Sequence, residues 1–144
     1  MIDLRLLCYK VGPRLAHRTC SASVFPVEIR AYDQAELFVT KDGSTIRELL
    51  GLVTAPVSNQ SLAEATLAPG QITDRHYHAE SEEFYYVLEG EGEMEVDGER
   101  AQVGPGDAIL IPPGAWHQIR AEGRSLRFLC CCAPAYRHED TFFD

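Results

Sequence analysis

Two short blocks bounded by glycines are the feature of this sequence that most constrains its fold. The first block runs from Gly70 to Gly90, and the second runs from Gly106 to His117. Together they contain three histidines and one glutamate: His76, His78, Glu83 and His117. Neutral imidazoles and a carboxylate form a mixed nitrogen and oxygen ligand set for a divalent first-row metal. The sequence therefore predicts one metal site, presented by short segments that end in turns.

The segments around these blocks have the composition of short β-strands. We predict strands over residues 27–31, 36–40, 61–67, 71–78, 83–89, 93–96, 99–103, 108–111, 116–120 and 126–132. Residues 45–50 permit two readings, because Thr45 and Glu48 can form a capping box that opens a helix or can begin a strand. Turns are expected at Gly90 and at Asp97-Gly98, which has the composition of a type I′ hairpin. Many short strands separated by turns predict an all-β sandwich or barrel.

Alternation along the strands predicts which side chains face the interior. His76 and His78 are two residues apart, so both side chains leave the same face of their strand. A polar loop follows and resets the alternation before the next strand. On that strand the inward set is Glu83, Tyr85 and Val87, and the outward set is Phe84, Tyr86 and Leu88. The neighbouring Glu82 is expected to face solvent.

Several other side chains are candidates for the wall of a ligand cavity. Tyr85 shares a face with Glu83, so it is a candidate proton-transfer group or hydrogen-bond donor, or else an ordinary barrel aromatic. Asp74 is either a cavity residue or a residue of the solvent-facing rim. Trp116 has the opposite parity to His117 and is expected to pack outward. The expected apolar lining consists of Ile72, Val87, Ile119, Phe128 and Cys130.

Composition excludes several classes of function. The 144 residues carry a formal net charge of −9, which argues against nucleic acid as a partner because phosphate binding favours a basic surface. No apolar run approaches the roughly 20 residues of a membrane span. The cysteines have no disulfide spacing, so we expect reduced thiols in a cytoplasmic protein, either as small core residues or, for Cys130 and Cys132, in the cavity wall. Residues 1–24 are expected to form an extension or a strand exchanged between subunits, and residues 25–144 the barrel domain.

The two blocks together resemble the paired motifs of the cupin superfamily. Its first motif, G-x5-H-x-H-x4-E-x6-G, is matched at every position from Gly70 to Gly90. Its second motif, G-x5-P-x-G-x2-H-x3-N, is matched from Gly106 to His117, but Ala121 stands where the motif has asparagine. The chain is similar to small single-domain bacterial cupins. The resemblance implies a jelly-roll barrel with His76, His78, Glu83 and His117 as ligands of one divalent Fe, Mn, Ni, Zn or Cu ion.

The resemblance also implies a range of activities. Four protein ligands leave two positions of an octahedral ion for a substrate or for a substrate and dioxygen. We expect an enzyme that acts on a small organic molecule, with a slight preference for a dioxygenase-type oxidation. The alternatives are a non-redox isomerase, cyclase or lyase, and a binding module without catalysis. We expect a homodimer, with the outward set and the N-terminal strands as its contact.

Overall fold

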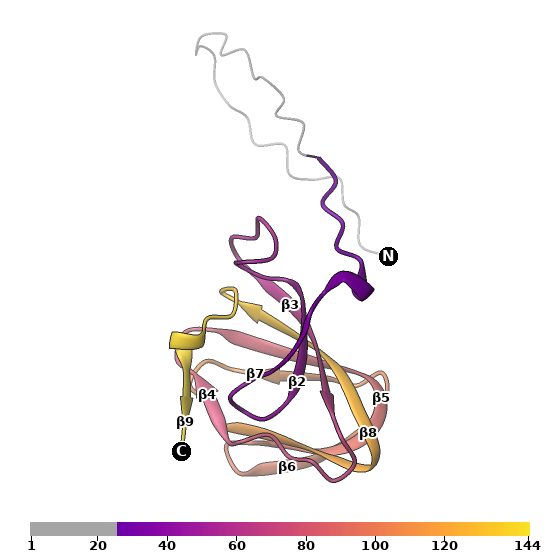
Figure 1. Cartoon of the computed structure of the whole chain (residues 1–144). Coiled ribbons are helices and arrows are strands. Elements are labelled where there is room, and N and C mark those ends of the chain that lie inside the picture. The colour runs from indigo at the N-terminus through magenta and orange to yellow at the C-terminus, as the bar shows by residue number, and fades with distance from the viewer. Residues whose placement is uncertain (1–25) are drawn as a thin grey trace, which may run out of the picture.

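Nine antiparallel strands form one curled sheet in the computed structural model, which describes residues 26–144 (Figure 1). The strands are β1 (Leu37–Val39), β2 (Thr45–Leu50), β3 (Ser61–Leu67), β4 (His76–His78), β5 (Glu82–Val96), β6 (Glu99–Val103), β7 (Ala108–Ile111), β8 (His117–Ala133) and β9 (Thr141–Phe143). Two single 3-10 turns, η1 (Tyr32–Gln34) and η2 (His138–Asp140), are the helical elements of this part. The predicted all-β barrel is confirmed. The predictions for residues 1–24 lie outside the described residues.

The two longest strands, β5 and β8, each pair with three other strands. β5 pairs with β6, β7 and β8, while β8 also pairs with β3 and β4. The sequence predicted two strands in place of each of them, and this was wrong. Each strand bends instead of ending, and the β5–β8 pairing continues across register shifts between Val87 and Glu91. A bend of this kind resembles a turn in sequence because both need glycine.

Gly90 lies at this bend and has a positive φ of 85°. A β-carbon at this position would lie 2.2 Å from the backbone oxygen of Ser125 on β8. Glycine is therefore needed here both for its backbone conformation and for the close approach of the two strands. The predicted hairpin turn between β5 and β6 is confirmed, since Asp97 and Gly98 have φ values of 48° and 86°.

The segments before β4 differ most from the predictions. Residues 27–31 form no strand; Val27 and Ile29 are exposed, and no strand within the described residues pairs with them. Residues 45–50 are a strand, because β2 is paired on both sides by β1 and β3. The predicted strand over 71–78 is reduced to β4 and an isolated bridge at Ile72. The chain is irregular between them, so Thr73 is buried and Ile72 is exposed, the reverse of the expected parity.

The inner face of the curled sheet carries the hydrophobic core. The core residues are Ala65, Leu67, Tyr85, Val87, Met94, Val103, Ile111, Ala115, Ile119, Ala121, Leu126 and Phe128. On the outer face, Phe84 and Tyr86 are 48% and 45% exposed, which confirms the predicted alternation of β5. The homodimer contact expected at this face stays a prediction. No helix within residues 26–144 has the length and apolar composition to cross a membrane.

Candidate metal centre

Three strands bring the four predicted ligand residues together. His76 and His78 come from β4, Glu83 from β5 and His117 from β8. His76 and His117 are paired directly across β4 and β8. One nitrogen or carboxylate oxygen from each residue lies within 4.8 Å of the corresponding atoms of the other three, and all four side chains are buried. The cluster can hold a metal ion.

The Nδ1 atom of each imidazole is already occupied by a hydrogen bond away from the cluster. His76 Nδ1 lies 2.8 Å from the carbonyl oxygen of Asp74, and His117 Nδ1 lies 3.0 Å from that of Ala115. A carbonyl only accepts, so Nδ1 carries the proton in both rings. His78 Nδ1 lies 3.2 Å from the hydroxyl of Thr141. Metal-binding histidines are commonly held in this way, with the other ring nitrogen free for the ion.

The inner atoms of the cluster lack the partners that burial requires. Glu83 Oε2 lies 3.2 Å from His78 Nε2 and 3.5 Å from His117 Nε2. Both Glu83 Oε2 and His117 Nε2 are buried without a hydrogen-bond partner. Unpaired buried polar atoms are costly, and these present lone pairs to one another. A cation among them would satisfy all of these atoms, so the residues present fit a divalent metal.

Burial and the close approach of the four side chains shift the pKa values of the cluster. Burial favours a higher pKa for Glu83, but the imidazoles of His117 and His78 outweigh it and hold that pKa well below its usual range. Burial favours a lower pKa for His78, but Glu83 outweighs it and raises the pKa above its ordinary value. Burial and the neighbouring His117 lower the pKa of His76. The carboxylate is therefore charged at neutral pH and attracts positive charge to the cluster.

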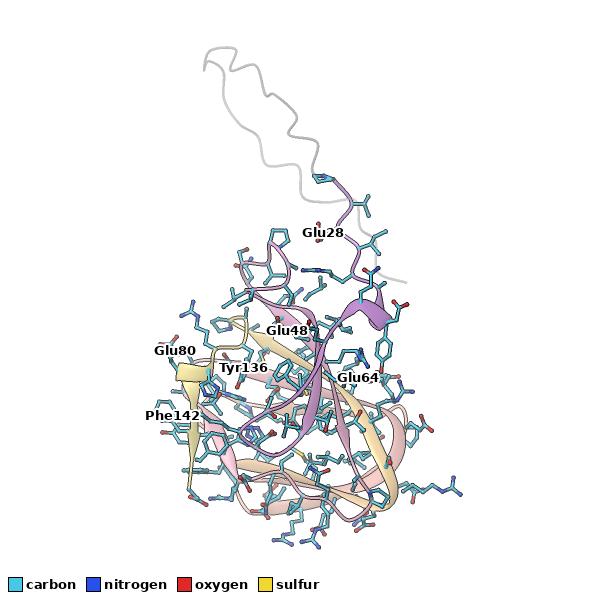
Figure 2. All side chains as sticks on the ribbon, viewed as in Figure 1. Glu28, Glu48, Glu64, Glu80, Tyr136 and Phe142 are labelled. Carbon is cyan, nitrogen blue, oxygen red and sulfur yellow. The ribbon has the colours of Figure 1, made fainter. Side chains whose placement is uncertain are left out.

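A cavity of about 80 Å³ opens onto the cluster. His76, His78 and Glu83 form part of its wall. Its apolar lining includes Phe38, Ile46, Ala63, Ala65, Phe128 and Phe143. Its polar lining includes Thr40, Lys41, Asp42, Ser44, Glu48, Ser61, Tyr136 and Thr141. The labelled Glu48 and Tyr136 belong to this wall (Figure 2).

The predicted lining is partly right. Phe128 and Cys130 line the cavity, and so does Cys132 on the same face of β8. Val87 and Ile119 belong to the core and not to the cavity wall. Ile72 is 39% exposed because the chain before β4 is irregular. The β1–β2 loop, Tyr136 and the C-terminal strand also contribute lining residues; no motif or periodicity in the sequence signalled them.

The structure also locates four other residues that the sequence singled out. Tyr85 is buried in the cavity wall, and its ring lies edge-on to His117 with a centroid separation of 6.1 Å. Burial raises the pKa of Tyr85 well above its ordinary value, so its hydroxyl is protonated at neutral pH. Asp74 and Glu82 are exposed. Trp116 is partly buried and packs outside the cluster against Tyr77.

The sequence of this chain is similar to those of known proteins. Residues 63–132 match the family described as the cupin domain. The chain is 49% identical over 111 residues to the uncharacterized protein MJ1618 of Methanocaldococcus jannaschii, covering 76% of this chain and 89% of that protein. It is 36% identical over 107 residues to polyketide synthase CurC of Streptomyces cyaneus, covering 70% of each.

Solved structures support the same assignment. The polyketide cyclase RemF from Streptomyces resistomycificus superposes with a TM-score of 0.66 at 26% sequence identity, over 80% of this chain and 89% of that chain. The family match includes all four clustered residues, which lie on β4, β5 and β8. The barrel, the paired motifs and these relatives together show that the chain belongs to the cupin family.

Proposed function

We propose that this chain is a metalloenzyme that converts a small organic molecule, with His76, His78, Glu83 and His117 as its metal ligands. The observation that carries the proposal is the pair of buried, unpartnered atoms Glu83 Oε2 and His117 Nε2, in a cluster of which His76, His78 and Glu83 line a cavity. A bound divalent ion would act there as a Lewis acid on a carbonyl or hydroxyl group or, if redox-active, would support reaction with dioxygen.

Tyr85 is the proposed proton donor. Its hydroxyl is protonated at neutral pH, so it has a proton to donate, and the raised pKa excludes a role as a base. Its ring is fixed between His117 and Phe128, with a centroid separation of 4.6 Å from the latter. Because the ring is rigid, its hydroxyl is already oriented, and binding a substrate costs little additional conformational entropy at this residue.

The cavity wall indicates the class of substrate. Aromatic and aliphatic side chains such as Phe38, Phe128 and Phe143 favour an apolar carbon skeleton. No arginine lines the cavity among residues 26–144, and Lys41 faces it together with the carboxylates Asp42 and Glu48. This mixed rim argues against a phosphorylated substrate. A keto or phenolic compound with oxygen atoms that reach the ion fits this wall best.

Between the two reaction classes we favour non-redox ring closure, isomerisation or elimination. The polyketide synthase protein and the polyketide cyclase named above align with this chain over 70% and 89% of their own lengths. On this support we rank the non-redox reaction ahead of the dioxygenase-type oxidation that the ligand set alone favoured. The dioxygenase-type oxidation remains the second candidate, because three imidazoles and one carboxylate also suit redox metals.

Metal content of the protein purified without added metal tests the ligand assignment. We expect close to one equivalent per chain in the wild type and a large loss in His78→Ala. His138→Ala is the matched control, because His138 is exposed and outside the cluster. Negligible metal in the wild type, or equal metal in His78→Ala, would contradict the assignment.

Turnover of polyketones and phenols, assayed with and without oxygen, then separates the reaction classes. Product formation under anaerobic conditions supports the non-redox reaction. Product formation that consumes oxygen in proportion supports the oxidation. Stabilisation by these compounds with no turnover in either condition would contradict the enzyme proposal and leave a binding module.

A further inference from the structure

The C-terminal strand β9 lies directly against the strand that carries two of the proposed ligands. It pairs with β4 in antiparallel register, with Phe143 opposite His76 and Thr141 opposite His78. Opposite residues of an antiparallel pair project on the same side of the sheet. Thr141 and Phe143 therefore reach the cluster, and both line the cavity. β9 lies outside residues 63–132, the part of the chain that matches the family profile.

The three imidazoles are not held in the same way. His76 and His117 each donate from Nδ1 to a carbonyl two residues earlier in the chain, so their orientation is set by local backbone. No carbonyl two residues earlier in the chain holds His78; the backbone of Asp140, immediately before β9, hydrogen-bonds its ring instead. Its Nδ1 partner is the Thr141 hydroxyl, 63 residues away in the sequence. Among the three rings, only the orientation of His78 depends on a distant element.

The hydrogen bonds of Thr141 favour one tautomer of His78. The hydroxyl lies 3.3 Å from the carbonyl oxygen of Arg137, to which it donates its one proton. Its oxygen can then only accept from His78, so the proton of the neutral ring lies on Nδ1. Nε2 is left with a free lone pair, 3.2 Å from Glu83 Oε2 and directed into the cluster.

Contacts on the other side of the pairing anchor β9. Phe142 stacks on Tyr77 with a centroid separation of 5.1 Å and an interplanar angle of 17°. The Asp144 carboxylate pairs with Arg75 at 3.0 Å. Immediately before β9, the Asp140 carboxylate accepts hydrogen bonds from the backbone N–H groups of residues 80 and 81. These contacts hold Thr141 in register with His78.

We propose that β9 is a positioning element of the metal centre and that Thr141 holds His78 in the tautomer that binds metal. This inference rests on the proposed metal site, but it concerns a residue that neither motif contains. Thr141 acts through His78 and is a positioning residue. Loss of its hydroxyl would let the neutral ring move its proton to Nε2, where it donates to Glu83 and has no lone pair for an ion.

Zn²⁺ affinity, measured by competition with a chelator, tests the proposal in the full chain. Thr141→Val keeps the shape of the side chain and removes the hydroxyl, and Thr141→Ser restores the hydroxyl. We expect Thr141→Val to bind Zn²⁺ at least about 10-fold more weakly than the wild type, and Thr141→Ser to recover most of the loss. Thr66→Val on β3 is the matched control, because Thr66 is not among the residues that line the cavity.

The tautomer of His78 is measured separately in metal-free protein by nitrogen-15 NMR, at a pH above the His78 pKa. The wild type and Thr141→Ser should carry the ring proton on Nδ1, and Thr141→Val should shift it toward Nε2. Unchanged Zn²⁺ affinity and an unchanged tautomer in Thr141→Val would overturn the proposal. A wild type that binds no Zn²⁺ contradicts the metal site itself, while the tautomer measurement still decides the role of Thr141.

Discussion

Cys132 donates a hydrogen bond to Glu83 across the β5–β8 pairing, with Sγ 3.3 Å from Oε1. The two residues lie directly opposite each other, so the thiol lies beside the carboxylate proposed to bind metal. Burial, and then Glu83, raise the pKa of Cys132 well above its usual range, which keeps the thiol protonated as a donor. The sequence left open whether this cysteine lines the cavity, and the structure places it there.

Replacing this thiol should weaken the fold and the site together. Cys132→Ala leaves Glu83 Oε1 without its donor, which we expect to lower the free energy of unfolding by about 1–3 kcal/mol. Cys132→Ser keeps a donor and should lose less. Urea denaturation of metal-free protein and Zn²⁺ affinity measure the two effects. Cys131→Ala is the control, because Cys131 pairs with the outward Phe84. An equal loss in Cys131→Ala and Cys132→Ala would argue against a specific role for the hydrogen bond.

Removal of the Glu83 charge should have a pH-dependent cost in metal-free protein. The folded pKa of Glu83 is lowered, so its stabilisation is present above the unfolded value of about 4.3 and is lost as pH falls through the folded pKa. The folded pKa of His78 is raised, so its stabilisation is present below the unfolded value of about 6.5 and is lost as pH rises through the folded pKa.

The stability advantage of the wild type over Glu83→Gln should therefore be largest between these limits. There we expect roughly 3 kcal/mol, because the variant removes the negative charge that lies 3.2 Å from the buried His78 ring. Denaturation curves of both proteins across the pH range give the difference directly. A difference that does not vary with pH would show that Glu83 stabilises the fold by shape and not by charge.

Gly90 should tolerate alanine less well than Gly98, although both have nearly the same φ. Gly98 has open space around the position of a β-carbon, so Gly98→Ala should cost only the left-handed strain, about 1–2 kcal/mol. Gly90→Ala adds the overlap with the Ser125 carbonyl and should cost about 3 kcal/mol or more. Urea denaturation followed by Trp116 fluorescence compares the two variants. Equal losses would mean that β5 and β8 separate at the bend without cost.

Tyr85→Phe should separate catalysis from binding. The variant removes the proposed proton donor but keeps the ring that packs on Phe128, so we expect kcat to fall by about 100-fold or more. Metal affinity and the melting temperature should stay close to those of the wild type. Tyr86→Phe is the control, because that neighbour is on the outer face and 45% exposed. Full activity in Tyr85→Phe would remove this residue from the proposed mechanism.

The ligand cluster could be predicted from sequence because its information is local. His76 and His78 share a face by alternation within β4, and the same alternation turns Glu83 and Tyr85 inward on β5. The cavity was harder to predict, since Ile72 was expected in its wall and is exposed. Its parity depended on a regular strand over residues 71–78, and the chain there is irregular.

The sequence by itself determined the strand-rich barrel, the four clustered residues and the inward and outward faces of β5, because these follow from strand alternation and from two short motifs that resemble those of the cupins. Only the tertiary structure decided that β5 and β8 continue through their bends, and that β9 lies beside β4 with Thr141 against His78. These features depend on pairing between segments far apart in the chain. Such pairing is stabilised by hydrogen bonds and side-chain contacts that form only once the sheet has curled, so no local pattern encodes it.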